Sequence, residues 1–138
     1  MIKFKIVTPE RVVYENDILQ ISIPTMSGEI TVLPHHVPLV SVLQAGELRI
    51  KDADGDQVVA VAGGFLEVRG NNELMILADH AERAEEIDLE RAEQARARAE
   101  KELEEAKHRQ DVDFSKLQAV LEREMNRTRV AKKYKDVH

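Results

Sequence analysis

The sequence predicts an all-β N-terminal sandwich, or flattened barrel, followed by a C-terminal antiparallel α-helical hairpin. All six glycines and all four prolines, the residues that interrupt helices, lie between Pro9 and Gly70. From Asp79 onward 30 of 60 residues are charged, against 16 of the 78 before it. The spacing of apolar residues also changes there, from the alternation of strands to the period of helices. We therefore expect one domain at residues 1–84 and a second at residues 85–138.

Short apolar segments separated by turn residues fill the first domain. The runs Asp52-Ala53-Asp54-Gly55 and Gly70-Asn71-Asn72 are typical of turns, and we expect strands to end at Pro24 and at Gly63-Gly64. Many short strands at this spacing indicate an antiparallel sandwich or flattened barrel. The nine expected strands are Ile2–Ile6, Arg11–Tyr14, Leu19–Ile23, Ile30–Val32, Leu39–Leu43, Leu48–Ile50, Gln57–Ala62, Phe65–Val68 and Leu74–Ala78.

Two stripes at helical spacing fill the second domain, separated by a polar stretch from Arg109 to Asp113. Asp113 is a suitable N-cap for the second helix. The first stripe is mostly alanine, which buries little area, so we expect the hairpin to be able to leave its docked position. The first stripe is Leu89, Ala92, Ala95, Ala99, Leu103 and Ala106, and the second is Phe114, Leu117, Leu121, Met125, Thr128 and Ala131.

Composition excludes several classes of function. The net charge of −6 disfavours nucleic acid as a partner, and the absence of cysteine excludes disulfides and thiol chemistry. No apolar run approaches the ~20 residues that cross a bilayer, and no signal-peptide pattern opens the chain. No serine nucleophile motif or phosphate-binding glycine loop is present, and the adjacent His35 and His36 lack metal-ligand spacing. We expect a non-catalytic cytoplasmic protein without a metal site.

Three motifs in the first domain point to a known family. Residues 27–39 read SGEITVLPHHVPL, and the runs Ala45–Leu48 and Val61–Phe65 read AGEL and VAGGF. With the β-then-hairpin architecture, they resemble the epsilon subunit of bacterial F-type ATP synthase over essentially the whole chain. The resemblance implies a rotor subunit, peripheral on the cytoplasmic face of the bacterial plasma membrane and attached to the membrane only through the complex.

The resemblance also implies the partners of each domain. The β domain would bind the gamma subunit of the central stalk and touch the c ring, with Glu29 and His36 facing the polar loops of that ring. For Glu29, a turn acid without a partner is an equally open interpretation. The hairpin would fold down on the sandwich, or extend along gamma towards the alpha and beta subunits and inhibit ATP hydrolysis.

The start of the first helix resembles the branch of the family whose hairpin binds ATP. Ile87-Asp88-Leu89-Glu90-Arg91-Ala92 matches that motif, although Asp88 also suits a helix N-cap. Lys116 stands where ATP-binding relatives carry Arg, and the turn before Asp113 is about two residues longer. The resemblance implies ATP, with or without Mg²⁺, as a regulatory ligand held by Glu82, Ile87, Asp88, Arg91, Ala92, Arg98, Arg123 and Arg127.

Arginine spacing bears on the same question. Arg91 and Arg98 lie within about 20° of each other on one helix, and Arg123 and Arg127 lie within about 40° on the other. Like charges four residues apart repel, so Arg123 and Arg127 call for a nearby anion. A glutamate of the hairpin or a polyphosphate could supply it, and we expect Arg123 to have only a minor structural role.

Two alternatives remain open from the sequence. One is an epsilon-type rotor subunit that does not bind nucleotide. The other is a free-standing β-sandwich and hairpin adaptor that dimerises through its helices.

Overall fold

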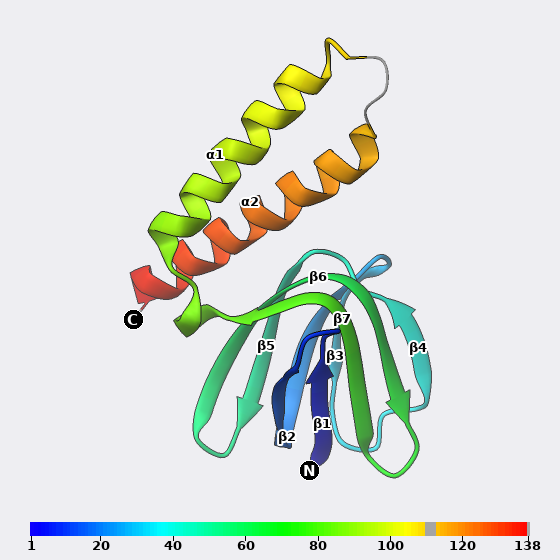
Figure 1. The fold of residues 1–138 in the computed structure, drawn as a ribbon. Coiled ribbons are helices and arrows are strands. Elements are labelled where there is room, and N and C mark those ends of the chain that lie inside the picture. Colours follow the sequence, from blue (N-terminus) through cyan, green and yellow to red (C-terminus); the bar gives the residue numbers. More distant parts are fainter. Residues whose placement is uncertain (110–112, 138) are drawn as a thin grey trace. The chain divides into compact units, whose positions relative to one another are not determined.

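The computed structural model describes residues 1–109 and 113–137, and of residues 136 and 137 only the backbone. It divides into two units, Met1–Arg83 and Ala84–His138. The first is built of strands and the second of helices (Figure 1). Within the described residues, no helix is both long and apolar enough to cross a membrane.

The first unit is a flattened barrel, as predicted. Its strand order is β1-β7-β6-β5-β2-β3, and β1 also pairs with β2, so five strands close into a ring. β3 extends the sheet beside β2, and β4 pairs with β6. One pairing departs from the expected antiparallel arrangement, because β1 and β7 run parallel. The strands are β1 (Ile2–Val7), β2 (Val12–Thr25), β3 (Gly28–Val32), β4 (Leu39–Val42), β5 (Gly46–Asp52), β6 (Gly55–Arg69) and β7 (Glu73–Arg83).

Seven strands replace the nine expected, because two pairs of predicted strands are each one continuous strand. β2 joins the segments expected at 11–14 and 19–23 and continues through Pro24 to Thr25, and β6 joins those expected at 57–62 and 65–68 through Gly63 and Gly64. Both glycines have positive φ, +74° and +106°, and a Cβ on Gly64 would lie 2.0 Å from the carbonyl oxygen of Leu77. The backbone therefore bends at a position that only glycine can occupy, while the pairing with β7 resumes at once.

The bend lets one strand serve two neighbours. Before it, β6 pairs with β5 from Gly55 to Val61, and after it β6 pairs with β4 from Phe65 to Val68. The pairing of β2 with β5 also contains an irregularity, a register shift between Ile18 and Gln20. Next to this shift, Leu19 is exposed and Ile18 is buried.

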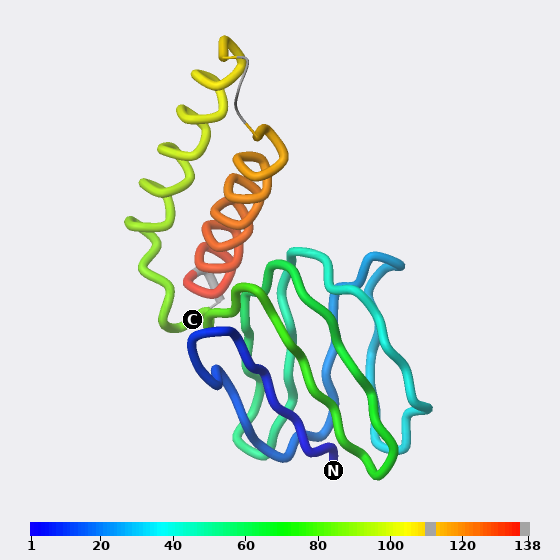
Figure 2. Tube along the Cα trace, turned by 45° about the vertical axis from the view of Figure 1, so that its right-hand side comes forward, coloured from blue at the N-terminus to red at the C-terminus, as the bar shows by residue number. Residues whose placement is uncertain are grey.

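The second unit is an antiparallel helical hairpin, as predicted. A single 3-10 turn, η1 (Ala84–Glu86), precedes α1 (Leu89–Ala106) and α2 (Phe114–Val137), and the two α-helices lie side by side in both views (Figures 1 and 2). Asp88 caps α1 by accepting from the Arg91 amide at 3.1 Å, and Asp113 accepts from the Lys116 amide at 3.2 Å. The predicted N-cap at Asp113 is confirmed.

The two predicted stripes fare differently. In α1 the alanines at 92, 99 and 106 are buried, as expected. In α2 Phe114 and Met125 are exposed, and Glu124 is buried beside Thr128 and Ala131. Glu124 is buried with its charge paired to Arg123 and Arg127, which an apolar pattern does not reveal.

Candidate functional site

A row of apolar side chains crosses the outer face of the first unit. Val7 pairs with Leu77, and Leu77 pairs with Phe65. Phe65 pairs in turn with Val42, and residues directly opposite each other in neighbouring strands share a face. Val42, Phe65 and Leu77 are 52%, 54% and 46% exposed. We call Val7, Val42, Phe65 and Leu77 the apolar row, and such a gathering on a surface is typical of a protein–protein contact.

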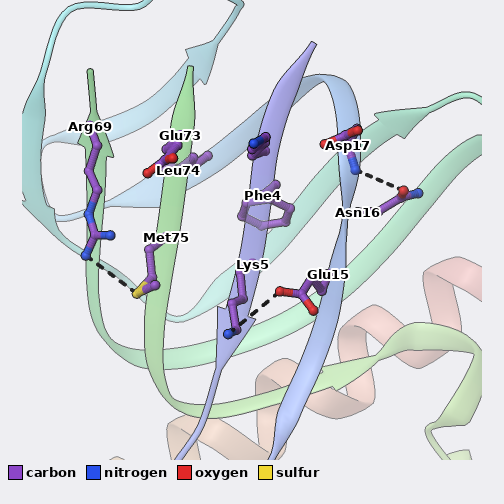
Figure 3. A pocket seen from close by; sticks show the side chains of 10 residues that line it. Phe4, Lys5, Glu15, Asn16, Asp17, Arg69, Glu73, Leu74 and Met75 are labelled. Carbon is purple, nitrogen blue, oxygen red and sulfur yellow. Dashed lines mark hydrogen bonds and ion pairs between the residues drawn. The ribbon is translucent and has the colours of Figure 1, made fainter. Parts of the chain in front are cut away.

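A charged hollow lies two strand positions along the same face (Figure 3). Its volume is about 430 Å³, and Phe4 and Leu74 are among the side chains that line it. Lys5 and Glu15 pair across it at 3.7 Å. The charges in the lining balance, which does not favour a polyanion such as a nucleotide here. They are Lys3, Lys5 and Arg69 against Glu15, Asp17 and Glu73.

The loop residues predicted to face a partner lie on the first unit. Glu29, on β3, forms a short ion pair with Arg49 of β5. Both side chains are about half exposed, and exposed pairs contribute at most ~1 kcal/mol, so this pair can exchange for another partner. The ring Nδ1 of His36 lies 2.7 Å from the carbonyl oxygen of Val37. Glu29 therefore has a partner within its own chain, so the interpretation of a turn acid without a partner is wrong, and its contact with the c ring stays a prediction.

A buried polar cluster secures the end of β7. The Tyr14 hydroxyl donates to Asp52 Oδ2 at 2.8 Å, and the guanidinium of Arg83 lies 5.4 Å from the centre of the Tyr14 ring. Arg83 Nε also donates to the Val13 carbonyl at 3.3 Å. Burial raises the pKa of Tyr14 to about 12, and the hydrogen bond to Asp52 adds to this shift. Arg83, the last residue of β7, is thus tied to β2.

The residues of the predicted nucleotide set divide between the two units. Glu82 lies on β7, in the first unit, and the remaining members lie in the second. Ile87 and Ala92 are buried. Arg91 is 85% exposed, and its Nε lies 3.8 Å from Asp88 Oδ2. Asp88 and Arg91 are therefore brought together at the start of α1, where Asp88 is also the N-cap.

Arg123 and Arg127 are brought together by a glutamate between them. Arg123 Nε donates to Glu124 Oε1 at 3.1 Å, and Arg127 Nη1 donates to Glu124 Oε2 at 2.7 Å. The Glu124 side chain is 6% exposed, and those of the two arginines are 28% and 25% exposed. The structural role of Arg123 is therefore not minor, because Arg123 neutralises a buried carboxylate.

Two other cationic side chains of the hairpin, Arg98 and Lys116, are exposed to solvent. The side chains of Arg98 on α1 and Lys116 on α2 are exposed and form no ion pair with the described residues. Lys132 of α2 pairs with Glu93 of α1 at 3.4 Å.

Among the residues that the structure describes, no group of three or more metal-ligating side chains is placed to hold a metal ion.

Two features of these sites escape prediction from the sequence. The apolar row and the pair between Glu29 and Arg49 depend on strand register, which brings together residues far apart in the chain. The anion that Arg123 and Arg127 call for is a glutamate of the hairpin, which was one of the two alternatives left open by the sequence, and the Arg-Glu-x-x-Arg spacing identifies it as Glu124.

Comparisons with known proteins agree with both units. Residues 1–84 match the family model described as the beta-sandwich domain of the ATP synthase delta/epsilon chain. Residues 85–132 match the model described as the long alpha-helix domain of the same chain.

Three curated relatives are each named ATP synthase epsilon chain. The chain is 44% identical over 126 residues to an ATP synthase epsilon chain of Halalkalibacterium halodurans, covering 91% of this chain and 93% of that protein. It is 49% identical over 102 residues to the one of Anoxybacillus flavithermus, covering 74% and 75%. It is 43% identical over 132 residues to one of Dehalococcoides mccartyi, covering 96% and 93%.

Solved structures share the fold. A chain in the cryo-EM structure of the Euglena gracilis mitochondrial ATP synthase aligns with a TM-score of 0.74 at 22% identity, covering 99% of this chain and 81% of that one. A chain from the central stalk and c ring of the Tetrahymena thermophila mitochondrial ATP synthase aligns with a TM-score of 0.58 at 17% identity, covering 96% and 95%. Taken with the two family models and the curated relatives, the chain belongs to the family of ATP synthase epsilon chains.

Proposed function

We propose that this chain is a non-catalytic rotor subunit of a proton-translocating ATP synthase, in which the β unit couples the gamma stalk to the c ring and the hairpin restrains ATP hydrolysis. The match of both units to one family carries the proposal. The two solved chains that share the fold belong to assemblies whose names include the c ring, and one of these names also includes the central stalk.

The apolar row is the surface that we assign to the gamma subunit. Val42, Phe65 and Leu77 expose apolar area on the outer face of the barrel. They are not members of the apolar core inside it. A partner that covers the row gains the hydrophobic contribution of about 25 cal/mol per Å² of buried area. The balanced charges of the neighbouring hollow would fix the partner's register.

We assign contact with the c ring to Glu29, near the start of β3, and to His36, in the loop that follows β3. Glu29 is exposed and His36 is half-buried, both on the first unit. An exposed carboxylate can leave Arg49 for a basic group of a c-subunit loop at little cost.

The hairpin is assigned the regulatory role. Its seam on α1 consists of alanines, so the two helices are held by modest apolar contacts and by surface ion pairs such as Lys132–Glu93. Contacts of this kind let one packing exchange for another at a cost of a few kcal/mol. In the extended form the cations of α2 would meet acidic segments of the alpha and beta subunits.

ATP, with or without Mg²⁺, is the regulatory ligand that we propose for the hairpin. Guanidinium groups suit phosphate oxygens, and Arg91, Arg123 and Arg127 present three of them from two helices. Asp88 would serve beside them as helix cap and as acceptor for the adenine amino group. Because only the docked hairpin pairs the two helices, bound ATP would favour it over the extended form.

The docking assignment is tested by co-expression with the gamma subunit. Phe65→Asp places a charge in the apolar row and should abolish co-purification with gamma. Leu19→Asp is the matched control, because Leu19 is 47% exposed on the same unit and is not part of the row. Circular dichroism would confirm that both variants fold. Retention of gamma by folded Phe65→Asp would refute the assignment.

The ATP assignment is tested by calorimetric titration of the full chain with ATP, in the presence and absence of Mg²⁺. Arg91→Ala should weaken ATP binding about tenfold or more, since a charge-assisted contact is lost. Arg129→Ala is the control, because Arg129 is an exposed arginine of α2 bonded to Asn126 rather than a member of the set. Equal ATP affinity of Arg91→Ala and the parent would exclude Arg91 from the site.

A further inference from the structure

The carboxylate of Glu124 accepts from guanidinium donors that a phosphate could use. Its two oxygens are divided between two guanidinium groups, Oε1 accepting from Arg123 at 3.1 Å and Oε2 from Arg127 at 2.7 Å. A terminal phosphate would offer these donors the same bridging geometry with more charge. A phosphate at these donors would therefore compete with the carboxylate.

The carboxylate is built into the fold rather than solvated. Glu124 is 5% exposed, and the turn that carries it is tied by a hydrogen bond from Thr128 Oγ1 to the Glu124 carbonyl at 2.9 Å. The neighbouring Glu122, two residues earlier on the same helix, is exposed. A buried carboxylate needs its partners, so the two arginines stabilise the ligand-free hairpin through Glu124.

We propose that Glu124 is an internal competitor of ATP, which holds Arg123 and Arg127 in the ligand-free hairpin and thereby weakens ATP binding. The inference rests on the proposed binding of ATP to the hairpin. Binding requires the guanidinium groups to turn from the carboxylate to the phosphates, and the carboxylate then opposes the incoming negative charge. Glu124 therefore sets the ATP concentration at which the docked hairpin becomes the favoured form.

Two readouts should move in opposite directions when the charge is removed. Glu124→Gln keeps the length of the side chain and an oxygen acceptor but loses the negative charge. ATP affinity measured by calorimetry should rise about tenfold or more. The melting temperature of the ligand-free chain should fall, because the amide carries no charge to neutralise the arginines and has one acceptor oxygen where the carboxylate has two. Glu122→Gln is the matched control and should change neither quantity.

A second variant keeps the test decisive if Glu124→Gln does not fold. Glu124→Met fills the buried position with an apolar chain of similar length, and the partly exposed arginines can turn to water. Helical content measured by circular dichroism shows which variant retains the hairpin. Either folded variant should bind ATP more tightly than the parent.

The outcomes separate this inference from the proposed function. If the parent binds ATP and the folded Glu124 variants bind it equally or less tightly, Glu124 does not compete, and ATP binding stands. If neither the parent nor the variants bind ATP, both the inference and the proposed ligand fail. Binding by the variants alone would support the competition and show that the parent's carboxylate abolishes binding.

Discussion

At the scale of single residues, Tyr14 is the group whose chemistry the fold changes most clearly. Its hydroxyl is buried and donates to Asp52, whose other oxygen accepts from the Asp54 amide at 2.8 Å. Tyr14→Phe removes one of these donors and leaves the buried carboxylate less well satisfied. We expect the free energy of unfolding at neutral pH to fall by about 1–3 kcal/mol, measured by urea denaturation.

The same contact predicts a pH dependence. The pKa of Tyr14 is raised to about 12 in the folded chain, against about 10 for an unfolded tyrosine. Because the folded state holds this proton more tightly, the stabilisation is complete below about pH 10 and is lost as the pH rises towards 12. The difference in unfolding free energy between the parent and Tyr14→Phe should therefore narrow over this range. A constant difference would show that the Tyr14 hydroxyl does not titrate there.

At the scale of elements, the alanine seam of α1 controls how closely the helices pack. Ala92 is fully buried, and Ala97, on the same helix, is exposed. Ala92→Leu adds volume at the seam and should destabilise the hairpin by about 1–3 kcal/mol. Thermal loss of the helical circular-dichroism signal measures the effect, and Ala97→Leu is the control, expected to change it little. Equal melting curves for the two variants would contradict the assigned seam.

The sequence predicts the elements well where a local pattern decides them. The alternation of apolar residues in β1, the alanines of α1 and the cap at Asp113 each follow from neighbours within one turn or one strand. The errors arise where contacts distant in sequence decide. Gly63 and Gly64 bend β6 without ending it, since the pairing with β7 continues.

The candidate sites show the same division. Asp88 and Arg91 are three residues apart on one helix, and the motif around them places them together. The apolar row needs the register of four strands, which no local pattern contains. Glu124 is buried against the apolar pattern, because Arg123 and Arg127 compensate its charge.

At the scale of the whole molecule, the two units divide assembly from regulation in the proposed function. The core of the first unit draws its members from the seven strands and the short connections between them. A chain that ends at Ile87 should therefore keep the barrel and the apolar row. It should also co-purify with gamma as the full chain does.

The most direct test of the regulatory role is the rate of ATP hydrolysis by the assembled enzyme. The rate would be compared between complexes that carry the full chain and complexes that carry residues 1–87, at equal subunit content. We expect faster hydrolysis with the shortened chain and unchanged assembly, because the hairpin that restrains the rotor is absent. Equal hydrolysis rates under conditions that favour the extended hairpin would contradict it.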